Sequence, residues 1–404
     1  MNINEQVEYL MQGTEYGDET LKQKMADELR NRLHTCQKEG RVLRVYCGFD
    51  PTKADLHLGH TVPMRKLRQF QELGHDVTFV IGNYTSLIGD PSDKDKLRPQ
   101  LTPEEVAANA RTYAEQAFRI MEEGKTHIRY NAEWLSELSF ADLIRLASNF
   151  TLQQFLTREN FKLRWDKGDP VYLHETFYSL MQGYDAFTLK ADVQVGGTDQ
   201  LFNIMTASRK IMEFLGAQPN IAIILGILPG TDGVVKMSKS LGNHVPISTD
   251  AVDMYGKVMS IPDSAMAVYY KLVTPLTPPE IAAIENGVQS GVIHPRDAKM
   301  RLAREIATAF YGGEEAQKAE KAFVETFQKG AIPEDIPAFK VSPSNSILEI
   351  LLLTNLVQSK SEARRLIEQK GVRFEAVVID DPAARIPQEG VLQVGKRHFI
   401  RIIF

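Results

Sequence analysis

One segment constrains the fold of this chain most strongly, because it alternates between strand and helix patterns. Residues Val42–Cys47 read as a strand, a helical pattern runs from His57 to Gly74, and His75–Ile81 reads as a second strand. A strand, a helix and a strand within about 40 residues form a βαβ unit. Such a unit requires a parallel sheet, and parallel sheets bind ligands at the carboxyl ends of their strands.

The same alternation returns later in the chain. A strand at Asp192–Val195 is followed by a helical pattern over Leu201–Leu215 and an apolar strand at Ile221–Leu225. The residues between the two regions, about 103–191, have a mostly helical pattern with apolar positions that could serve a dimer contact. We therefore expect an α/β, Rossmann-like parallel-sheet domain over residues 1–230 that contains this helical insertion.

The rest of the chain differs in character. Residues 231–246 form a glycine-bracketed loop, and residues 247–330 are helical by composition. Residues 331–345 contain three prolines and little periodicity, which is typical of a linker. Residues 346–404 then read as two helices followed by two strands. The sequence therefore predicts an all-helical domain and a small α+β domain after the Rossmann-like domain.

Composition excludes several classes of protein. The chain has 404 residues, of which 43% are apolar and 25% charged, as in a globular protein of two or three domains. Its apolar runs are shorter than the ~18–20 residues that span a bilayer, and its first twenty residues carry five acidic and no basic side chains, unlike a signal peptide. Two cysteines, Cys36 and Cys47, argue against a disulfide framework. We expect a cytoplasmic protein without a membrane segment. Because its net charge is −5, any nucleic-acid surface must be a local patch.

The stretch from Tyr46 to His60 carries the first chemical signal. His57 and His60 are three residues apart at the start of the predicted helix, so they share one face, and free backbone N–H groups there favour an anion. Gly59 lacks a Cβ, which lets a flat ring such as a purine lie against the backbone. Together with the Thr52 hydroxyl, the two imidazoles suit a polyphosphate, although a His-x-x-His pair alone also fits a structural role. A zinc site would need a third ligand, and none is evident nearby, so we predict no metal site.

The second signal is a loop in which Lys236 and Lys239 lie three residues apart with Ser240 beside them. A mobile loop with two cations suits the departure of pyrophosphate, whereas a Lys-x-x-Lys pair by itself is more often a solvated turn. Lys94 and Arg98 form a third cationic segment that could close over the same phosphates. The P-loop motif Gly-x-x-x-x-Gly-Lys-Ser/Thr is absent from the sequence, which disfavours P-loop chemistry.

The two signals together identify a resemblance. His57-Leu-Gly-His60, followed about 180 residues later by Lys236-Met-Ser-Lys-Ser240, is the paired signature of class I aminoacyl-tRNA synthetases. Within that class the chain resembles the bacterial-type tyrosyl-tRNA synthetases over essentially its whole length, and residues 346–404 are similar to an S4-type RNA-binding domain. The matching stretches are Tyr46–Thr52, Ile88–Ser92, Tyr178–Asp185 and Gln194–Gln200.

This resemblance implies a tyrosine–tRNA ligase that works in two steps. The carboxylate of L-tyrosine attacks the α-phosphate of ATP, which carries Mg²⁺, and gives tyrosyl-adenylate and pyrophosphate. The tyrosyl group then passes to the 3′ end of tRNA(Tyr). Neither a bound cofactor nor a protein nucleophile is implied, so catalysis rests on positioning and charge stabilisation. The resemblance also implies a homodimer, with the helical insertion as the contact.

The resemblance further assigns roles to individual residues. The catalytic set around the triphosphate is Thr52, His57, His60, Lys94, Arg98, Lys236, Lys239 and Ser240. The ATP-binding set is Cys47, Gly48, Gly59, His60, Gly197, Asp199 and Lys239. The tyrosine-binding set is Tyr46, Asp50, Asp90, Tyr178, Gln182, Asp185 and Gln200.

Helix spacing supports the tyrosine-binding set. Tyr178, Gln182 and Asp185 fall at positions i, i+4 and i+7, so one helix face presents all three. Tyr46 and Asp185 are expected to bind the phenolic hydroxyl of the substrate. In isolation, the same residues also fit a core aromatic and a helix cap.

In residues 346–404 a basic helix face is expected to contact RNA. Ser359 and Glu362 predict the start of that helix and Gly371 its end. Lys360 and Arg364 share one face of it, with further cations beside them. The expected RNA-binding residues are Lys360, Arg364, Arg365 and Lys370.

Three other functions compete with tyrosine–tRNA ligation. A tryptophan-specific enzyme is built on the same plan, but Tyr46 and Asp185 favour a phenol over an indole. A free-standing nucleotidyltransferase would not need the C-terminal unit or the lysine loop. A non-catalytic RNA-binding protein would not need residues that grip pyrophosphate.

Overall fold

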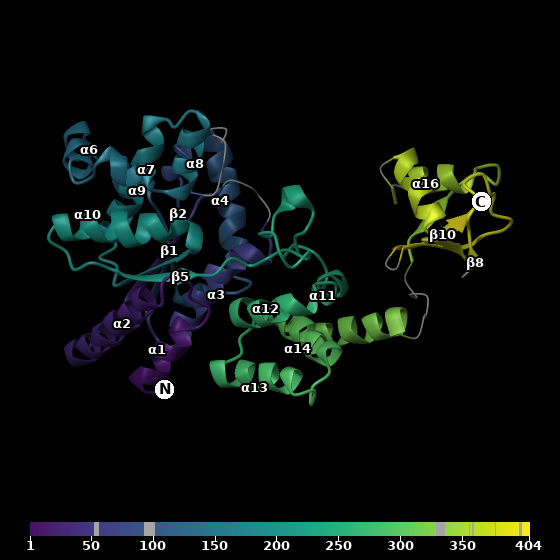
Figure 1. Ribbon diagram of the computed structural model, residues 1–404, viewed down its shortest axis with the longest axis horizontal. Coiled ribbons are helices and arrows are strands. Elements are labelled where there is room, and N and C mark those ends of the chain that lie inside the picture. The colour runs from purple at the N-terminus through teal and green to yellow at the C-terminus, as the bar shows by residue number, and fades with distance from the viewer. Residues whose placement is uncertain are drawn as a thin grey trace. The chain divides into compact units, whose positions relative to one another are not determined.

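The computed structural model describes residues 1–51, 56–92, 102–328, 336–354, 356–357, 359–375, 377–395 and 398–404 (Figure 1). Thr52, Lys94 and Arg98, three of the residues expected at the active site, lie outside these ranges. Contacts between residues divide the chain into two compact units, Met1–Ala316 and Gln317–Phe404. Each unit has its own sheet.

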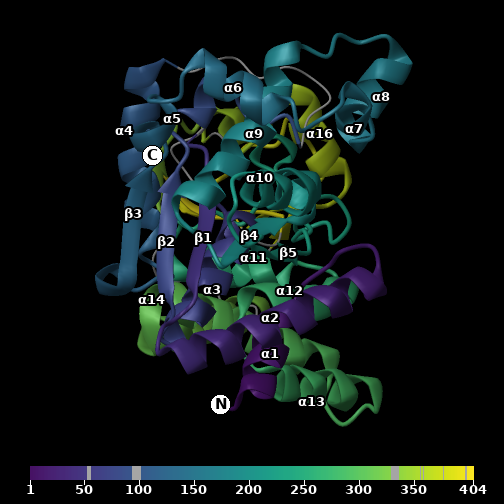
Figure 2. The same ribbon diagram turned by 90° about the vertical axis from the view of Figure 1, so that its left-hand side faces the viewer.

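The first unit is built on a sheet of five parallel strands, which confirms the Rossmann-like prediction. The strand order is β3-β2-β1-β4-β5, and Figure 2 shows the strands side by side in this order. The chain winds outward from β1 in one direction and then from β4 in the other. The carboxyl ends of β1 and β4 therefore flank the switch point at which open α/β sheets bind ligands. The strands are β1 (Arg44–Phe49), β2 (Asp76–Ile81), β3 (Thr126–Tyr130), β4 (Val193–Gly197) and β5 (Ile221–Leu225).

Helices pack against this sheet. Helix α3 contacts β1, β2 and β4, while Tyr46 and Val80 of the sheet pack with Ala186 of α9 and Met212 of α10. The helices of the first half of the unit are α1 (Ile3–Met11), α2 (Glu19–Glu39), α3 (Leu58–Glu72), α4 (Pro103–Ala117), α5 (Ala132–Leu135), α6 (Phe140–Ala147), α7 (Leu152–Leu156), α8 (Glu159–Lys167), α9 (Leu173–Thr188) and α10 (Arg209–Phe214).

Helix α3 also holds the N-terminal helix through one buried side chain. The Lys66 ammonium donates hydrogen bonds to the carbonyl oxygens of Leu10 and Gln12, at 2.8 and 3.0 Å, where α1 ends. The last carbonyls of a helix lack intrahelical partners, so the lysine satisfies them. Burial lowers the pKa of the Lys66 ammonium to about 7.

Two local predictions need correction. The segment 103–191 is mostly helical as expected, but it also supplies β3, which pairs with β2 as an edge strand of the main sheet. The predicted helix over Leu201–Leu215 begins as a π-helix, Phe202–Ser208, before α10 continues it. A π-helical turn carries one more residue than an α-helical turn, and the apolar spacing of the sequence does not reveal it.

The described part of residues 247–330, which ends at Gln328, consists mainly of helices. The helices are α11 (Ala251–Met259), α12 (Met266–Val273), α13 (Pro278–Gln289) and α14 (Pro295–Gln328). Gly312 interrupts α14 with a φ of 82°, a conformation that favours glycine. The contacts place residues as far as Ala316 in the same unit as the sheet. None of the helices among the described residues is long and apolar enough to cross a membrane.

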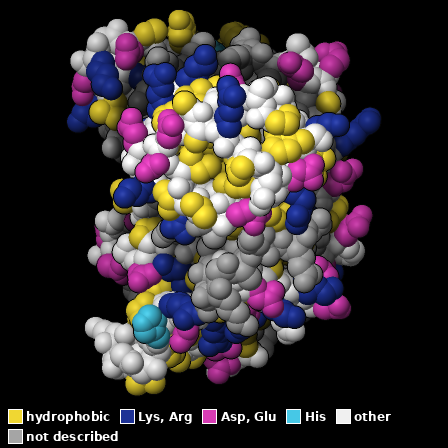
Figure 3. Space-filling model, turned by 90° about the vertical axis from the view of Figure 1, so that its right-hand side faces the viewer, with side chains coloured by type: hydrophobic (Ala, Val, Ile, Leu, Met, Phe, Trp, Pro, Cys, Tyr) yellow, Lys and Arg dark blue, Asp and Glu magenta, His cyan; other side chains and the backbone are white. Residues whose placement is uncertain are grey.

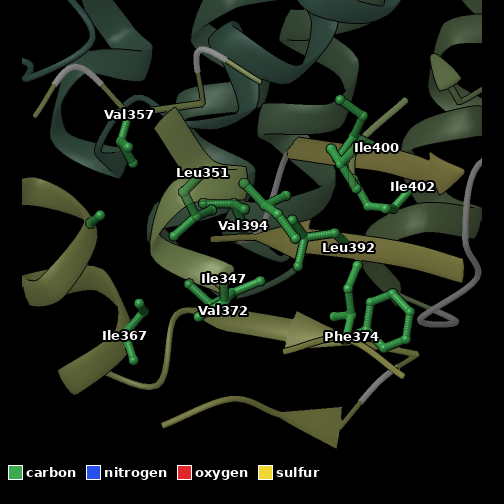
Figure 4. Packing of buried hydrophobic residues seen from close by; sticks show 14 residues of the cluster. Ile347, Leu351, Val357, Ile367, Val372, Phe374, Leu392, Val394, Ile400 and Ile402 are labelled. Atoms are coloured by element: carbon green, nitrogen blue, oxygen red, sulfur yellow. The ribbon is translucent and has the colours of Figure 1, made fainter. Parts of the chain in front are cut away.

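The second unit packs two helices on a small mixed sheet of order β6-β10-β9-β7-β8. Figure 4 shows its apolar core, in which Ile347 and Leu351 of α15 face Leu392 and Ile402 of the sheet. Its elements are β6 (Ala338–Lys340), α15 (Ile347–Leu353), α16 (Lys360–Glu368), β7 (Val372–Phe374), β8 (Val377–Val378), β9 (Gly390–Val394) and β10 (His398–Ile403).

This unit differs from its prediction in three ways. It has more strands than the expected two, because short strands give little alternation to read. Strand β6 lies inside the predicted linker 331–345 and pairs in parallel with β10, so the sheet begins before residue 346. After α16 the left-handed residue is Lys370, with a φ of 58°, rather than the predicted Gly371.

Candidate active site

The candidate site lies at the carboxyl ends of β1 and β4: Cys47 and Gly48 are near the end of β1, and Gly197 and Asp199 lie at and just after the end of β4. Burial raises the pKa of the Cys47 thiol, and the nearby Asp199 carboxylate raises it further. The thiol is therefore neutral at physiological pH and can serve as a weak hydrogen-bond donor.

The deepest part of the site is built around Asp185 of α9. This carboxylate is 4% exposed and accepts hydrogen bonds from Trp134 Nε1 at 2.7 Å and Asn131 Nδ2 at 3.3 Å. Burial raises the pKa of Asp185 to about 7, although both hydrogen bonds act in the opposite direction. Burial also raises the pKa of Tyr46, with a further contribution from the charge of Asp185. The Tyr46 hydroxyl donates a hydrogen bond to the backbone carbonyl of Gln182 at 3.2 Å. The pair thus brings a buried carboxylate and a buried hydroxyl to the deepest part of the site.

Asp50, just after β1, forms a second polar centre. It accepts hydrogen bonds from the Tyr178 hydroxyl at 3.0 Å and from Thr85 Oγ1 at 2.8 Å. Gly82 makes this contact possible, since a Cβ at that position would lie 2.1 Å from Asp50 Oδ1. Asn131 donates to Thr85 Oγ1 at 3.1 Å as well as to Asp185, so one amide connects the two centres.

Asp90 forms the third polar centre, with Gln200. The Gln200 amide donates to Asp90 Oδ2 at 2.6 Å, and the same Gln200 accepts a hydrogen bond from Asn203 at 3.0 Å. Asn203 lies in the π-helical segment, which turns its side chain toward Ser92 and Gln200. The Gln182 side-chain oxygen is buried and has no hydrogen-bond partner among the described residues. A buried acceptor without a partner is costly, and a bound ammonium group would satisfy it.

The imidazoles form the phosphate side of the site. The His57 and His60 rings lie 3.8 Å apart between centroids, and the His60 ring accepts a hydrogen bond from the His57 backbone N–H. His244 lies 6.2 Å from His57, so a third imidazole joins the expected pair. Burial lowers the pKa of His57 to about 2, with smaller contributions from His60, His244 and the lysines of the loop. His57 is therefore neutral in this structure.

The structure brings the two signature motifs together. Leu58 N–H donates to the Val245 carbonyl at 3.0 Å, and Ile247 N–H donates to the Leu56 carbonyl at 3.2 Å, so backbone pairing flanks His57. Lys236 Nζ lies 3.6 Å from Asp199 Oδ2. A Cβ on Gly59 would lie 3.1 Å from the His57 ring, which is a tight contact.

The expected residues thus divide into three groups. Those from β1, α3, α9, β4 and the lysine loop lie around the carboxyl ends of β1 and β4. Thr52, Lys94 and Arg98 fall outside the described residues. The expected RNA-binding residues, Lys360, Arg364, Arg365 and Lys370, are exposed on or just after α16 of the second unit. Figure 3 shows Lys and Arg side chains interspersed with Asp and Glu side chains on one face of the molecule.

Several residues of the site had no signal in the sequence. Thr85, Asn131 and Trp134 support Asp50 and Asp185, yet each is an ordinary residue of a loop or short helix. Asn203 and His244 come from the π-helix and from the segment after the lysine loop. Among the described residues, no group of three or more His, Cys, Asp or Glu side chains could hold a metal ion.

Comparisons with known proteins agree on one family. Residues 37–328 match the model of the family described as tRNA synthetases class I (W and Y). The chain is 46% identical over 379 residues to a tyrosine–tRNA ligase of Moorella thermoacetica, covering 93% of this chain and 92% of the relative. It is 43% identical over 403 residues to tyrosine–tRNA ligase 2 of Clostridium acetobutylicum, covering 100% and 99%.

Solved structures show the same fold. A C-terminally truncated mitochondrial tyrosyl-tRNA synthetase of Aspergillus nidulans matches with a TM-score of 0.60 and 25% identity, over 74% of this chain and 89% of the other. The tyrosyl-tRNA synthetase of Archaeoglobus fulgidus, solved with L-tyrosine, matches with a TM-score of 0.60 and 20% identity, over 79% and 100%.

Proposed function

The chain belongs to the class I tRNA synthetases of the tryptophan and tyrosine group, and its activity is tyrosine–tRNA ligation; from this premise we propose how its residues divide the work. The relatives that match at this identity over nearly the full length are tyrosine–tRNA ligases, which supports specificity for tyrosine. They disfavour the three alternatives: a tryptophan enzyme, a free-standing nucleotidyltransferase and a non-catalytic RNA-binding protein.

Tyr46 and Asp185 bind the phenolic hydroxyl of tyrosine in this proposal. Asp185 accepts a hydrogen bond from the phenolic hydroxyl, and the Tyr46 hydroxyl, which donates to the Gln182 carbonyl oxygen at 3.2 Å in this structure, turns to donate to the same phenolic oxygen. The burial of Asp185 supports this role, because an analogue without the hydroxyl offers this desolvated carboxylate no further hydrogen bond. Trp134 and Asn131 are positioning residues that orient Asp185.

The α-ammonium group of tyrosine binds where Asp90, Tyr178 and Gln182 converge, and Gln200 lies near the carboxyl end. The unpartnered Gln182 oxygen and the hydrogen bond from Gln200 to Asp90 support this assignment. Asp50 positions Tyr178 through its 3.0 Å hydrogen bond. The substrate carboxylate then points toward the ends of β1 and β4.

The triphosphate of ATP, with its Mg²⁺ as part of the substrate, lies along His57, His60 and the lysine loop. The ribose and adenine lie against Cys47, Gly48, Gly59, Gly197 and Asp199. The tyrosine carboxylate attacks the α-phosphate, and Lys236, Lys239 and Ser240 stabilise the charge that builds on pyrophosphate. Thr52, Lys94 and Arg98 are assigned to the same phosphates from the sequence pattern. No protein nucleophile is part of this mechanism.

The meeting of the two motifs carries the proposal: Lys236 lies at the end of β4 while the chain after the loop pairs with both sides of His57. The test is tyrosine-dependent exchange of pyrophosphate with ATP, run separately with each of the twenty amino acids. Exchange with tyrosine alone is expected. Exchange with tryptophan at a comparable rate would contradict the assigned pocket.

tRNA(Tyr) is the second substrate, and we assign phosphate contacts to Lys360, Arg364 and Arg365 of α16 and to Lys370 just after it. All four side chains are exposed, which supports that role. We propose the cytoplasm as the compartment of this chain, because its curated relatives are bacterial enzymes.

We assign homodimer formation to the helices of the insertion. Phe140 of α6 and Leu173 of α9 are 77% and 65% exposed, and Leu152 and Trp165 of the neighbouring helices are similarly exposed. Helices α6, α7 and α8 lie at the same end of the first unit in Figures 1 and 2. Leu173→Asp should shift the protein from dimer to monomer in sedimentation equilibrium. Val292→Asp, at a comparably exposed site outside the insertion, is the control.

A further inference from the structure

One buried side chain, the amide of Asn243, ties together the loop that carries the two signature lysines. Asn243 is 7% exposed. Its Oδ1 accepts a hydrogen bond from Ser238 N–H at 2.8 Å, and its Nδ2 lies 3.4 Å from the carbonyl oxygens of Val235 and Lys236. The amide therefore contacts the backbone before, at and after Lys236.

The other partner of the Asn243 amide is the Asp232 carboxylate, which accepts a hydrogen bond from Nδ2. Asp232 Oδ1 also accepts from the backbone N–H groups of Val234 and Val235, at 2.8 and 2.7 Å. The hydrogen bond from Asn243 is the largest cause that lowers the pKa of Asp232, so this carboxylate stays ionised. Gly230 admits the amide, because a Cβ at Gly230 would lie 2.2 Å from Asn243 Nδ2.

The backbone at and just after Asn243 connects the lysine loop to the first motif. Asn243 O accepts a hydrogen bond from Thr231 N–H at 2.8 Å, and two residues later Val245 O accepts one from Leu58 N–H at 3.0 Å. Leu58 is the first residue of α3, immediately after His57. Asn243 is thus fixed to the lysine loop, and Val245, two residues further along the chain, is bonded to the helix that presents the imidazoles.

We propose that Asn243 is a positioning residue for the departure of pyrophosphate: its amide holds the backbone of Lys236 and Ser238 in register with His57. The proposal rests on the proposed role of Lys236, and Asn243 itself touches no substrate. Only a side chain that both donates and accepts can make these contacts. Alanine removes them, and aspartate would place a second carboxylate against Asp232.

Two half-reactions separate this role from general destabilisation. Lys236 acts while pyrophosphate is leaving, whereas pyrophosphate is gone when the adenylate reacts with tRNA. Asn243→Ala should slow tyrosine-dependent pyrophosphate exchange by roughly 10–100-fold, because a misplacement of about 1 Å can cost that much. Single-turnover transfer of tyrosine from the isolated enzyme–adenylate complex to tRNA should stay within about twofold of the wild-type rate. Asn286→Ala, an exposed asparagine of α13, is the matched control and should change neither rate.

A double variant tests whether Asn243 acts through Lys236. If it does, Asn243→Ala combined with Lys236→Ala should be about as slow in exchange as Lys236→Ala alone, since coupled residues are not additive. Additive losses would overturn the proposal, as would an equal slowing of exchange and transfer or an unchanged exchange rate in Asn243→Ala. If Lys236→Ala itself leaves exchange unchanged, the proposed function of the loop fails instead.

A milder variant covers the case in which Asn243→Ala does not fold. Asp232→Asn keeps the shape of the exposed Asp232 side chain but removes its charge and one of its hydrogen-bond acceptors. It should slow exchange by a smaller factor, again with transfer preserved. An Asp232→Asn enzyme that folds and exchanges at the wild-type rate would contradict the proposed support of the loop.

Discussion

The ammonium group of Lys236 lies 3.6 Å from the carboxylate of Asp199, and the two residues come from the lysine loop and from the turn after β4. This ion pair places a cation of the second signature motif at the sheet edge where the adenosine is expected. It is part-exposed, so its contribution to stability is small. The ion pair matters because it holds the Lys236 ammonium at the edge of the sheet, where it can bind a phosphate group of ATP.

Substituting one residue of either signature motif should therefore slow adenylate formation and leave tyrosine binding unchanged. His57→Ala and Lys236→Ala should each lower the rate of tyrosine-dependent pyrophosphate exchange by roughly 10²–10³-fold, the scale for loss of one group that stabilises transition-state charge. Calorimetric titration should give the wild-type affinity for tyrosine, since neither residue touches that pocket. Lys271→Ala, on α12 and paired with Glu285, is the control for loss of a lysine. Wild-type exchange in both active-site variants would remove the assigned roles.

Asp185 should determine the choice between tyrosine and phenylalanine. Asp185→Ala removes the buried acceptor of the phenolic proton, and a hydrogen bond to a charged group is worth roughly 1.5–3 kcal/mol. The ratio of kcat/KM for tyrosine over phenylalanine should therefore fall by at least about tenfold. Trp134→Phe removes the 2.7 Å donor to Asp185 and should reduce selectivity in the same direction by a smaller factor. Unchanged selectivity in Asp185→Ala would refute this pocket.

The raised pKa of Asp185 also predicts how stability depends on pH. Its pKa is about 7 in the folded protein and about 3.9 in the unfolded chain, so the folded state binds the extra proton between these values. The stabilising effect of that proton is complete below pH 4 and is lost as the pH rises through 7. Relative to Asp185→Asn, the wild-type protein should lose roughly 2–3 kcal/mol of unfolding free energy between pH 5 and pH 8. Urea unfolding of both proteins at the two pH values measures this; a constant difference would mean that Asp185 titrates normally.

The second unit should matter for RNA and not for adenylate formation. A chain that stops after Gln328 lacks the whole sheet β6–β10 with its apolar core and keeps the first unit. It should retain pyrophosphate exchange within about twofold and lose most of its rate of tRNA charging. Full-length protein with Lys360 and Arg364 both changed to Ala should show an intermediate loss, and this loss relative to wild type should shrink at higher salt because fewer phosphate contacts remain to be screened. Normal charging by the shortened chain would contradict the role given to α16.

The parts that the sequence predicts well share a physical reason. The βαβ unit and the helix face of Tyr178, Gln182 and Asp185 are regular repeats, so spacing alone places their side chains. Features that depend on contacts between residues far apart in the chain could not be predicted from the sequence. Asn131 connects Asp50 and Asp185 through a contact with Thr85, 46 residues away, and no local pattern indicates it. Strand β3 is stabilised by its pairing with β2, which is distant in the chain, so the local sequence did not predict it.

The contact between Lys66 and the end of α1 has a practical consequence for handling this enzyme. Deleting the first twelve residues would strip a buried ammonium of its acceptors, on the very helix that begins beside His57. A buried cation without partners must either lose its proton or draw water inward, and both would disturb the imidazole end of that helix. Deletion of the N-terminal residues would therefore impair ATP binding at the start of α3.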